Sequence, residues 1–178
     1  MSAQALVVDM SYTATGWVVA RLGAGTPEPI IGQGFITTEP LKNARSKVES
    51  DVLRCVSIMD ELGCMASRYD VSLLIVEQPL GREGYYYGKT VGVCCGVVAA
   101  LRHFADLAWL PITPYEGKRA VTGRKNASKE AVQEIVVGWW PEAATWEGYE
   151  HCCDALAALV AARTSDLYRM AAQAGKAP

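Results

Sequence analysis

The segment Ala5-Leu6-Val7-Val8-Asp9 consists of four apolar residues followed by an acid. An uninterrupted apolar run is typical of a strand that is buried on both faces of a sheet. The small polar residues Ser11, Thr13, Thr15 and Gly16 then predict a tight turn into a second strand, Trp17 to Ala20. Asp9 therefore ends a buried strand, where a carboxylate is costly unless a cation compensates it. Alternatively, Asp9 only caps the turn, and acids at matching positions elsewhere would decide against that.

A second apolar run ends on an acid in the same way. Ile30 to Ile36 is a third strand, and short turns between the first three strands predict an antiparallel meander. Residues 42–69 carry apolar side chains at helical spacing, which predicts a long amphipathic helix. The next strand, Val71 to Val76, is followed by Glu77. Because a strand–helix–strand connection favours parallel pairing, Asp9 and Glu77 should meet at the same edge of the sheet.

Two segments combine cations with residues suited to nucleic acid. The loop from Gly81 to Lys89 interleaves aromatic residues with cations, which suits base stacking and phosphate contact. An interface and simple loop packing are the alternatives, and composition alone favours packing. The nucleic-acid-binding candidates in this loop are Arg82, Tyr86 and Lys89. A helix, Thr90 to Phe104, and a fifth strand, Leu107 to Thr113, should follow. After Pro114 come five cations within twelve residues: Lys118, Arg119, Arg124, Lys125 and Lys129. We expect a phosphate-contacting loop and then a helix from Lys129 to Val137, with a solvated charged face as the alternative.

The alanine-rich segment from Tyr149 to Ala162 predicts a helix. His151 and Asp154 are three residues apart, so they share a face near its beginning. Asp154 lies among apolar residues, where a charge without a partner would be destabilising. The sequence thus predicts a third acid whose charge needs a neighbouring cation.

The composition excludes several classes of protein. With 178 residues, 51% of them hydrophobic and 20% charged, the chain fits one globular domain. A net charge of −2 means that nucleic-acid binding would depend on a local basic patch. Six cysteines without C-x-x-C spacing argue against a zinc site and favour reduced thiols, as in a cytoplasm. We expect no membrane span and no signal peptide, because no apolar run is long enough.

The order of elements and four motifs resemble the RuvC-type Holliday-junction resolvases of the ribonuclease H-like superfamily. The matching segments are Leu6-Val7-Val8-Asp9 with Thr15-Gly16, Ile75-Val76-Glu77-Gln78, Lys118 to Gly123 with Ala127 to Gln133, and His151 to Ala157. The resemblance implies an α/β fold with a five-stranded mixed sheet, an antiparallel meander plus parallel strands, flanked by helices. It implies a nuclease domain over residues 1–170; residues 171–178 should form a disordered tail.

The resemblance also implies a function. The chain would be a crossover junction endodeoxyribonuclease that resolves four-way DNA junctions by paired nicks, with two metal ions per site. Metal ligands would be Asp9, Glu77, His151 and Asp154, with Lys118 and Lys129 near the scissile phosphate. Mg²⁺ would serve, and Mn²⁺ should substitute because imidazole is a softer ligand than carboxylate. A two-fold symmetric substrate implies a homodimer, with the helix from Thr90 to Phe104 in its interface.

Two departures from the family pattern stand out. Met10-Ser11 follows the first acid in place of Pro-Gly, and Leu80 stands near the position of an aromatic wedge, for which Tyr85 to Tyr87 are alternatives. These departures favour a divergent bacterial or viral protein of the cytoplasm, or an organellar one. Other interpretations are a broader branched-DNA or RNA-processing nuclease, a non-catalytic nucleic-acid-binding module, and an actin-like phosphotransferase, for which the chain is too short.

Overall fold

A computed structural model of the chain describes residues 2–23, 25–78 and 85–174. Its strands are β1 (Gln4–Asp9), β2 (Ala14–Arg21), β3 (Ile30–Thr37), β4 (Leu73–Glu77) and β5 (Ala108–Ile112). Its α-helices are α1 (Lys47–Arg68), α2 (Tyr85–Phe104), α3 (Pro114–Thr122), α4 (Lys129–Trp139), α5 (Tyr149–Ala162) and α6 (Asp166–Ala174), with a 3₁₀ turn η1 (Pro141–Thr145).

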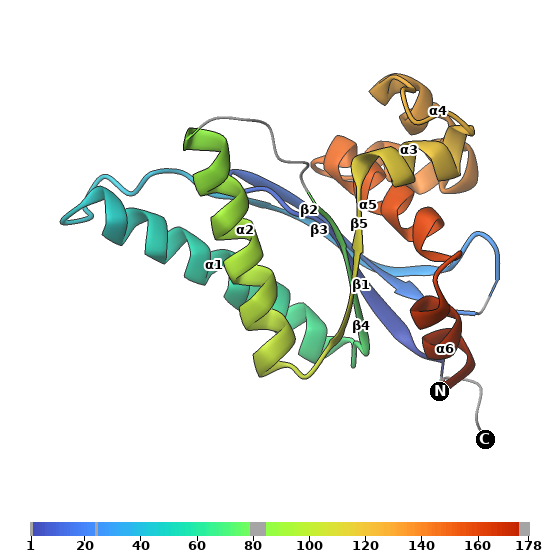
Figure 1. Ribbon diagram of the computed structural model, residues 1–178, viewed down its shortest axis with the longest axis horizontal. Coiled ribbons are helices and arrows are strands. Elements are labelled where there is room, and N and C mark those ends of the chain that lie inside the picture. The colour runs from blue at the N-terminus through green and yellow to red at the C-terminus, as the bar shows by residue number, and fades with distance from the viewer. Residues whose placement is uncertain (1, 24, 79–84, 175–178) are drawn as a thin grey trace.

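The five strands form one mixed sheet in the order β3-β2-β1-β4-β5. Strands β1, β2 and β3 pair antiparallel, while β4 pairs parallel to both β1 and β5. The predicted meander with parallel strands is therefore confirmed. Helices α1 and α2 cover one face of the sheet and α3 to α6 lie on the other (Figure 1).

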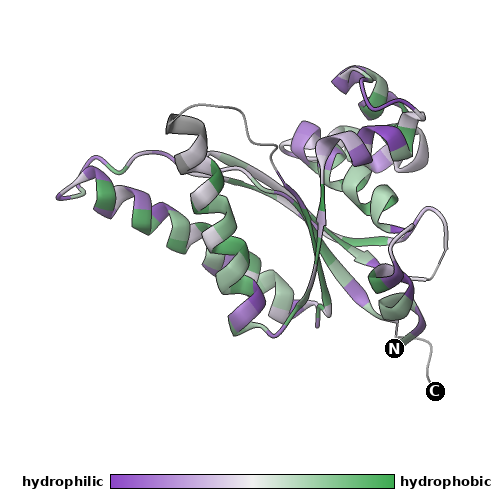
Figure 2. Cartoon of the chain, viewed as in Figure 1, coloured by the Kyte–Doolittle hydropathy of each residue, from purple (hydrophilic) through white to green (hydrophobic). Residues whose placement is uncertain are grey.

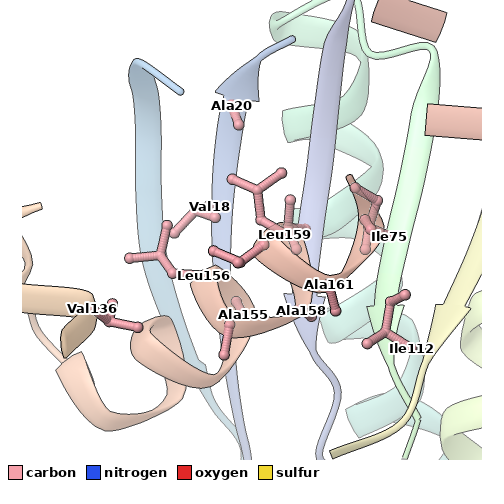
Figure 3. Packing of buried hydrophobic residues seen from close by; sticks show 14 of the residues in the cluster. Val18, Ala20, Ile75, Ile112, Val136, Ala155, Leu156, Ala158, Leu159 and Ala161 are labelled. Atoms are coloured by element: carbon pink, nitrogen blue, oxygen red, sulfur yellow. The ribbon is translucent and has the colours of Figure 1, made fainter. Parts of the chain in front are cut away.

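Each face of the sheet has its own apolar core, because the strand side chains alternate. In β1, Ala5 and Val7 pack toward α5, while Leu6 and Val8 pack toward α1 and α2. All residues of α5 from Ala155 to Ala162 are buried, and its alanines let the helix lie close to the central strands (Figure 3). Figure 2 shows that α5 is hydrophobic, whereas α3 above it is more hydrophilic.

Three predicted boundaries are corrected by the structure. Helix α2 begins at Tyr85 and not at Thr90, because the tyrosines expected in a loop form its first turn. The basic segment after Pro114 is a helix, α3, since Thr113 and Glu116 form a capping box at its start. Residues 171–174 belong to α6 and not to a disordered tail, while residues 175–178 lie outside the described part of the chain.

A buried ionic clamp ties the end of the chain to the β2–β3 connection. The side chain of Glu28 is 2% exposed, and its carboxylate accepts hydrogen bonds from both the guanidinium of Arg163 and the hydroxyl of Tyr168. The indole of Trp140 donates to the backbone oxygen of Glu28 at 2.9 Å. Burial, and then the hydrogen bond to Glu28, raises the pKa of Tyr168. The clamp therefore holds α6 in place through buried polar groups that have hydrogen-bond partners.

Candidate active site

Two carboxylates lie side by side at the carboxyl ends of the central strands. Asp9 ends β1 and is directly opposite Glu77, which ends β4. Side chains two residues apart on a strand point to the same face of the sheet. Val7 and Ile75 pack toward α5, so Asp9 and Glu77 also project toward α5. On the other side of Asp9, the register partner on β2 is Gly16.

Helix α5 brings the remaining site residues over this sheet edge. A Cβ added to Gly16 would lie 2.6 Å from the backbone of His151, so only a glycine lets the first turn of α5 come this close. The imidazole Nδ1 of His151 lies 2.6 Å from Oδ2 of Asp9. One ligand atom from each of Asp9, His151 and Asp154 falls within 4.8 Å of the others. Strand ends and the helix start thus bring together residues far apart in the sequence.

The site carries more negative than positive charge. Burial, and then the charges of Asp9 and Asp154, raises the pKa of Glu77 to about 9. Burial and the charge of Asp9 likewise raise the pKa of Asp154. The hydrogen bond to Asp9 raises the pKa of His151 against the effect of burial. Carboxylates that resist ionisation in this way are stabilised by added cations.

Lys129 is the cation in direct contact with the cluster. Its Nζ lies 3.0 Å from Oδ2 of Asp154 and 3.5 Å from Oε2 of Glu150. Burial lowers the pKa of Lys129, but the charges of Asp154 and Glu150 outweigh it, so the pKa is raised. Lys118 donates to the backbone oxygen of Ala127 at 2.9 Å, and its charge acts on Glu77. The two lysines therefore hold positive charge next to the acids.

The donor set fits a hard divalent cation. Carboxylate oxygens and one imidazole are ligands of Mg²⁺ and Mn²⁺, and three of them already converge. Glu77 is outside that converging group, but it lies beside Asp9 in register and is electrostatically coupled to the same acids. The thiol of Cys152 lies 3.6 Å from the backbone oxygen of Gly34 and is not among the three residues whose ligand atoms converge.

Comparison with known proteins agrees with this arrangement. The crossover junction endodeoxyribonuclease RuvC of Pseudothermotoga lettingae is 26% identical over 129 residues, which is 72% of this chain and 75% of that protein. The fold matches T. thermophilus RuvC in complex with a Holliday junction substrate, with a TM-score of 0.73, 20% identity, and coverage of 90% and 93% of the two chains. The chain is similar to RuvC in sequence and in fold. No protein-family model matches it.

A second structural match extends the likeness beyond bacterial RuvC. The yeast mitochondrial Holliday junction resolvase Ydc2 superposes with a TM-score of 0.60 at 12% identity, covering 98% of the RuvC-like chain and 84% of Ydc2. Both structural matches establish the ribonuclease H-like fold. None of the described helices is both long and apolar enough to cross a membrane.

The structure places only some of the residues that the sequence predicts to contact DNA. Arg119, Arg124 and Lys125 are exposed around the α3–α4 connection, and no ion pair engages them within the described residues. Tyr86 and Lys89 lie in α2, but the positions of their side chains are not described. Leu80 and Arg82 lie outside the described residues. The basic patch is thus helical at its start and exposed at its centre.

Sequence reasoning missed two site residues. Glu150 contacts Lys129, and its position four residues before Asp154 on one helix could have indicated a shared cation. Phe35 stacks on the ring of His151. Its only sequence signal is a single aromatic residue following Gly32 and Gly34 in β3.

Proposed function

We propose that this chain is a metal-dependent endonuclease that resolves four-way DNA junctions. The observation that carries the proposal is the cluster of Asp9, His151 and Asp154, with Glu77 in register beside Asp9, at the strand ends of a RuvC-like sheet. Three acids that need cations, flanked by a basic surface, suit hydrolysis of a phosphodiester. The match to RuvC favours branched DNA as the substrate.

We assign Asp9, Glu77, His151 and Asp154 as the metal ligands. When bound, two divalent ions supply a water of lowered pKa and stabilise the leaving oxygen. Mg²⁺ suits the carboxylates, and the imidazole of His151 should make Mn²⁺ at least as effective. The chain's own contribution is to hold these groups on rigid elements, two on central strands and two on the first turns of α5.

Two lysines act on the substrate in this proposal. Lys129 lies at the edge of the acid cluster, where its ammonium can face a phosphate oxygen as negative charge develops. Lys118 supports the α3–α4 connection through Ala127 and adds charge on the same side. Arg119, Arg124 and Lys125 are free to contact backbone phosphates, which would give affinity without sequence preference.

We further propose a homodimer formed through α1 and α2. Val48, Val52 and Val56 recur every four residues along α1, with exposures of 71%, 54% and 38%. On α2, a Cβ added to Gly88, Gly92 or Gly96 would meet no atom of the described part of the chain within 4 Å, so this glycine stripe is open there. A groove of about 670 Å³ lies between these helices. An exposed apolar groove beside a stripe without side chains suits close packing of a second copy.

We propose a reducing cellular compartment from the state of the cysteines. None of the six cysteines forms a disulfide within the described residues, which supports a reducing compartment such as the cytoplasm of a bacterium or of a virus-infected cell, with an organelle as the alternative.

A cleavage assay with matched substrates tests the proposal. Purified protein with Mg²⁺ or Mn²⁺ should nick a four-way junction in paired positions and leave linear duplex intact, and chelation of the metal should stop the reaction. Asp9→Asn should abolish cleavage while retaining junction binding, because it removes a ligand and leaves the basic surface. Preferential cutting of flaps or RNA would indicate a broader nuclease, and binding without cutting would indicate a non-catalytic module.

A further inference from the structure

A single row of residues crosses the sheet at the active site. Pairing places Phe35 of β3 opposite Gly16 of β2, Gly16 opposite Asp9, and Asp9 opposite Glu77. Residues in such a row share one face of the sheet, here the face toward α5. Gly16 leaves a gap in the row, and the backbone of His151 fills that gap between Asp9 and Phe35.

The ring of Phe35 stacks on the imidazole ring of His151. The two ring centroids are 5.5 Å apart and the ring planes differ by 20°, which is a stacked arrangement. The same ring lies over Gly148, the residue before α5, where an added Cβ would overlap it. Gly148 has φ of 61°, which a glycine adopts without strain. Phe35 therefore contacts both the start of α5 and its first functional side chain.

We propose that Phe35 is a positioning residue that fixes the orientation of the His151 imidazole. Asp9 engages one ring atom, Nδ1, but a single contact leaves the ring free to swing about it. Stacking on Phe35 removes that freedom, so the imidazole stays in place when the carboxylate of Asp9 turns to a cation. Ligands held in advance bind metal more tightly than mobile ones. This inference rests on the proposed metal-binding role of His151.

The chain offers a matched pair for the test, because it contains two phenylalanines and two histidines. His103 packs edge-to-face on Phe104 at 5.1 Å, on the distant end of α2, while His151 stacks on Phe35. Imidazole proton resonances of the metal-free protein report each stack through the ring current. Phe35→Leu should move the His151 resonances and leave those of His103 in place. Phe104→Leu should do the reverse, and Phe35→Tyr should resemble the wild type.

Mn²⁺ titration of the same variants, followed by calorimetry without DNA, supplies the second measurement. Phe35→Leu should raise the dissociation constant roughly 10-fold, as loss of an orienting group does at other metal sites. Phe35→Tyr and Phe104→Leu should leave it unchanged. If Phe35→Leu does not fold, a nuclear Overhauser contact between the Phe35 and His151 rings in the wild type decides the stack, and Phe35→Met replaces it in the titration.

Two results would overturn the inference. One is an unchanged His151 resonance in Phe35→Leu, and the other is wild-type Mn²⁺ affinity in that variant. If both are found together with a loss of junction affinity, Phe35 is a DNA contact instead. Failure of the proposed function looks different: the wild type itself would bind no Mn²⁺, while the resonances would still show whether the rings stack.

Discussion

The acidic side chains of the candidate site lie close together with fewer cations than carboxylates around them. Asp9, Glu77 and Asp154 face one another with Lys129 and His151 as their cations, and burial raises the pKa of two of the acids. A protein that needed only stability would replace such groups with apolar ones. Their presence is what the proposed binding of cations and substrate requires, and it makes the metal-free protein sensitive to pH.

Glu77→Gln should stabilise the metal-free protein at alkaline pH. Because the pKa of Glu77 rises from 4.5 to about 9 on folding, the folded state holds a proton that the unfolded state lacks, and stability falls as pH rises between these values. At pH 8 with a chelator, Glu77→Gln should gain on the order of 1 kcal/mol, or about 2–4 °C in Tm. Thermal unfolding from pH 4.5 to 9 measures this. Glu134→Gln, exposed on α4, is the control, and a wild-type curve as flat as that of Glu77→Gln would contradict the prediction.

Lys129→Met should separate metal binding from cleavage. A cation must compete with the ammonium of Lys129 for Asp154, so the variant should bind Mn²⁺ more tightly, by roughly 3- to 10-fold for a partly exposed pair. Cleavage should nevertheless slow on the order of 100-fold, because the charge facing the phosphate is lost. Calorimetry and single-turnover nicking measure the two effects.

Lys125→Met is the matched control for that experiment. Lys125 is exposed and belongs to the same basic patch, so its loss should leave Mn²⁺ affinity unchanged while the salt slope of junction binding falls by about 1. Equal Mn²⁺ affinity in the wild type and in Lys129→Met would show that this lysine does not compete with metal.

Helices and strands differ in how well the sequence predicts them. The apolar runs before Asp9 and Glu77 identify buried strands, and the strand–helix–strand order makes them parallel neighbours, so the acid pair could be found without coordinates. The alanine-rich α5 was equally clear. Helix α3 was missed because its cations suggested a loop, although the sequence Thr113-Pro114-Tyr115-Glu116 is a capping box with proline at the first helical position.

Contacts between elements that do not pair as neighbouring strands could not be predicted from the sequence. Phe35 and His151 are on β3 and α5, and nothing local in either element indicates the other. The ionic clamp of Glu28, Arg163 and Tyr168 likewise joins a loop to the last helices across more than a hundred residues. Such pairs depend on the path of the whole chain, and a single sequence carries no local pattern for them.

At the level of helix packing, Arg163→Met should be strongly destabilising. It leaves the carboxylate of Glu28 buried without its guanidinium, which costs about 3–5 kcal/mol when one partner of a buried pair is removed. Arg169→Met breaks a surface pair with Asp166 and should change stability by about 0.5 kcal/mol or less. Urea unfolding compares them. Glu28→Gln combined with Arg163→Met should recover part of the loss, and equal stability of the two single variants would refute the clamp.

The described part of the molecule has one group of converging metal-ligand candidates, so the proposed paired incision would require two copies of the chain. Val52→Asp places a charge on the exposed face of α1 and should convert the proposed dimer to a monomer in light scattering. On a supercoiled plasmid with a cruciform, the monomer should yield nicked circles where the dimer yields linear product. Met170→Asp, at a residue that is also exposed but lies on α6, should remain dimeric. A wild type that is monomeric with and without junction DNA would exclude this interface.

The division of the active site between β1 and α5 has a consequence for synthesis of the chain on the ribosome. Asp9 and His151 are 142 residues apart, so the first acid leaves the ribosome long before its partner is translated. Until α5 packs on the sheet, the strand-end acids have neither His151 nor Asp154 and cannot complete a metal site. Under the proposed function, a nascent or truncated chain that lacks α5 should therefore not cut DNA, and cleavage should begin only after α5 has packed on the sheet.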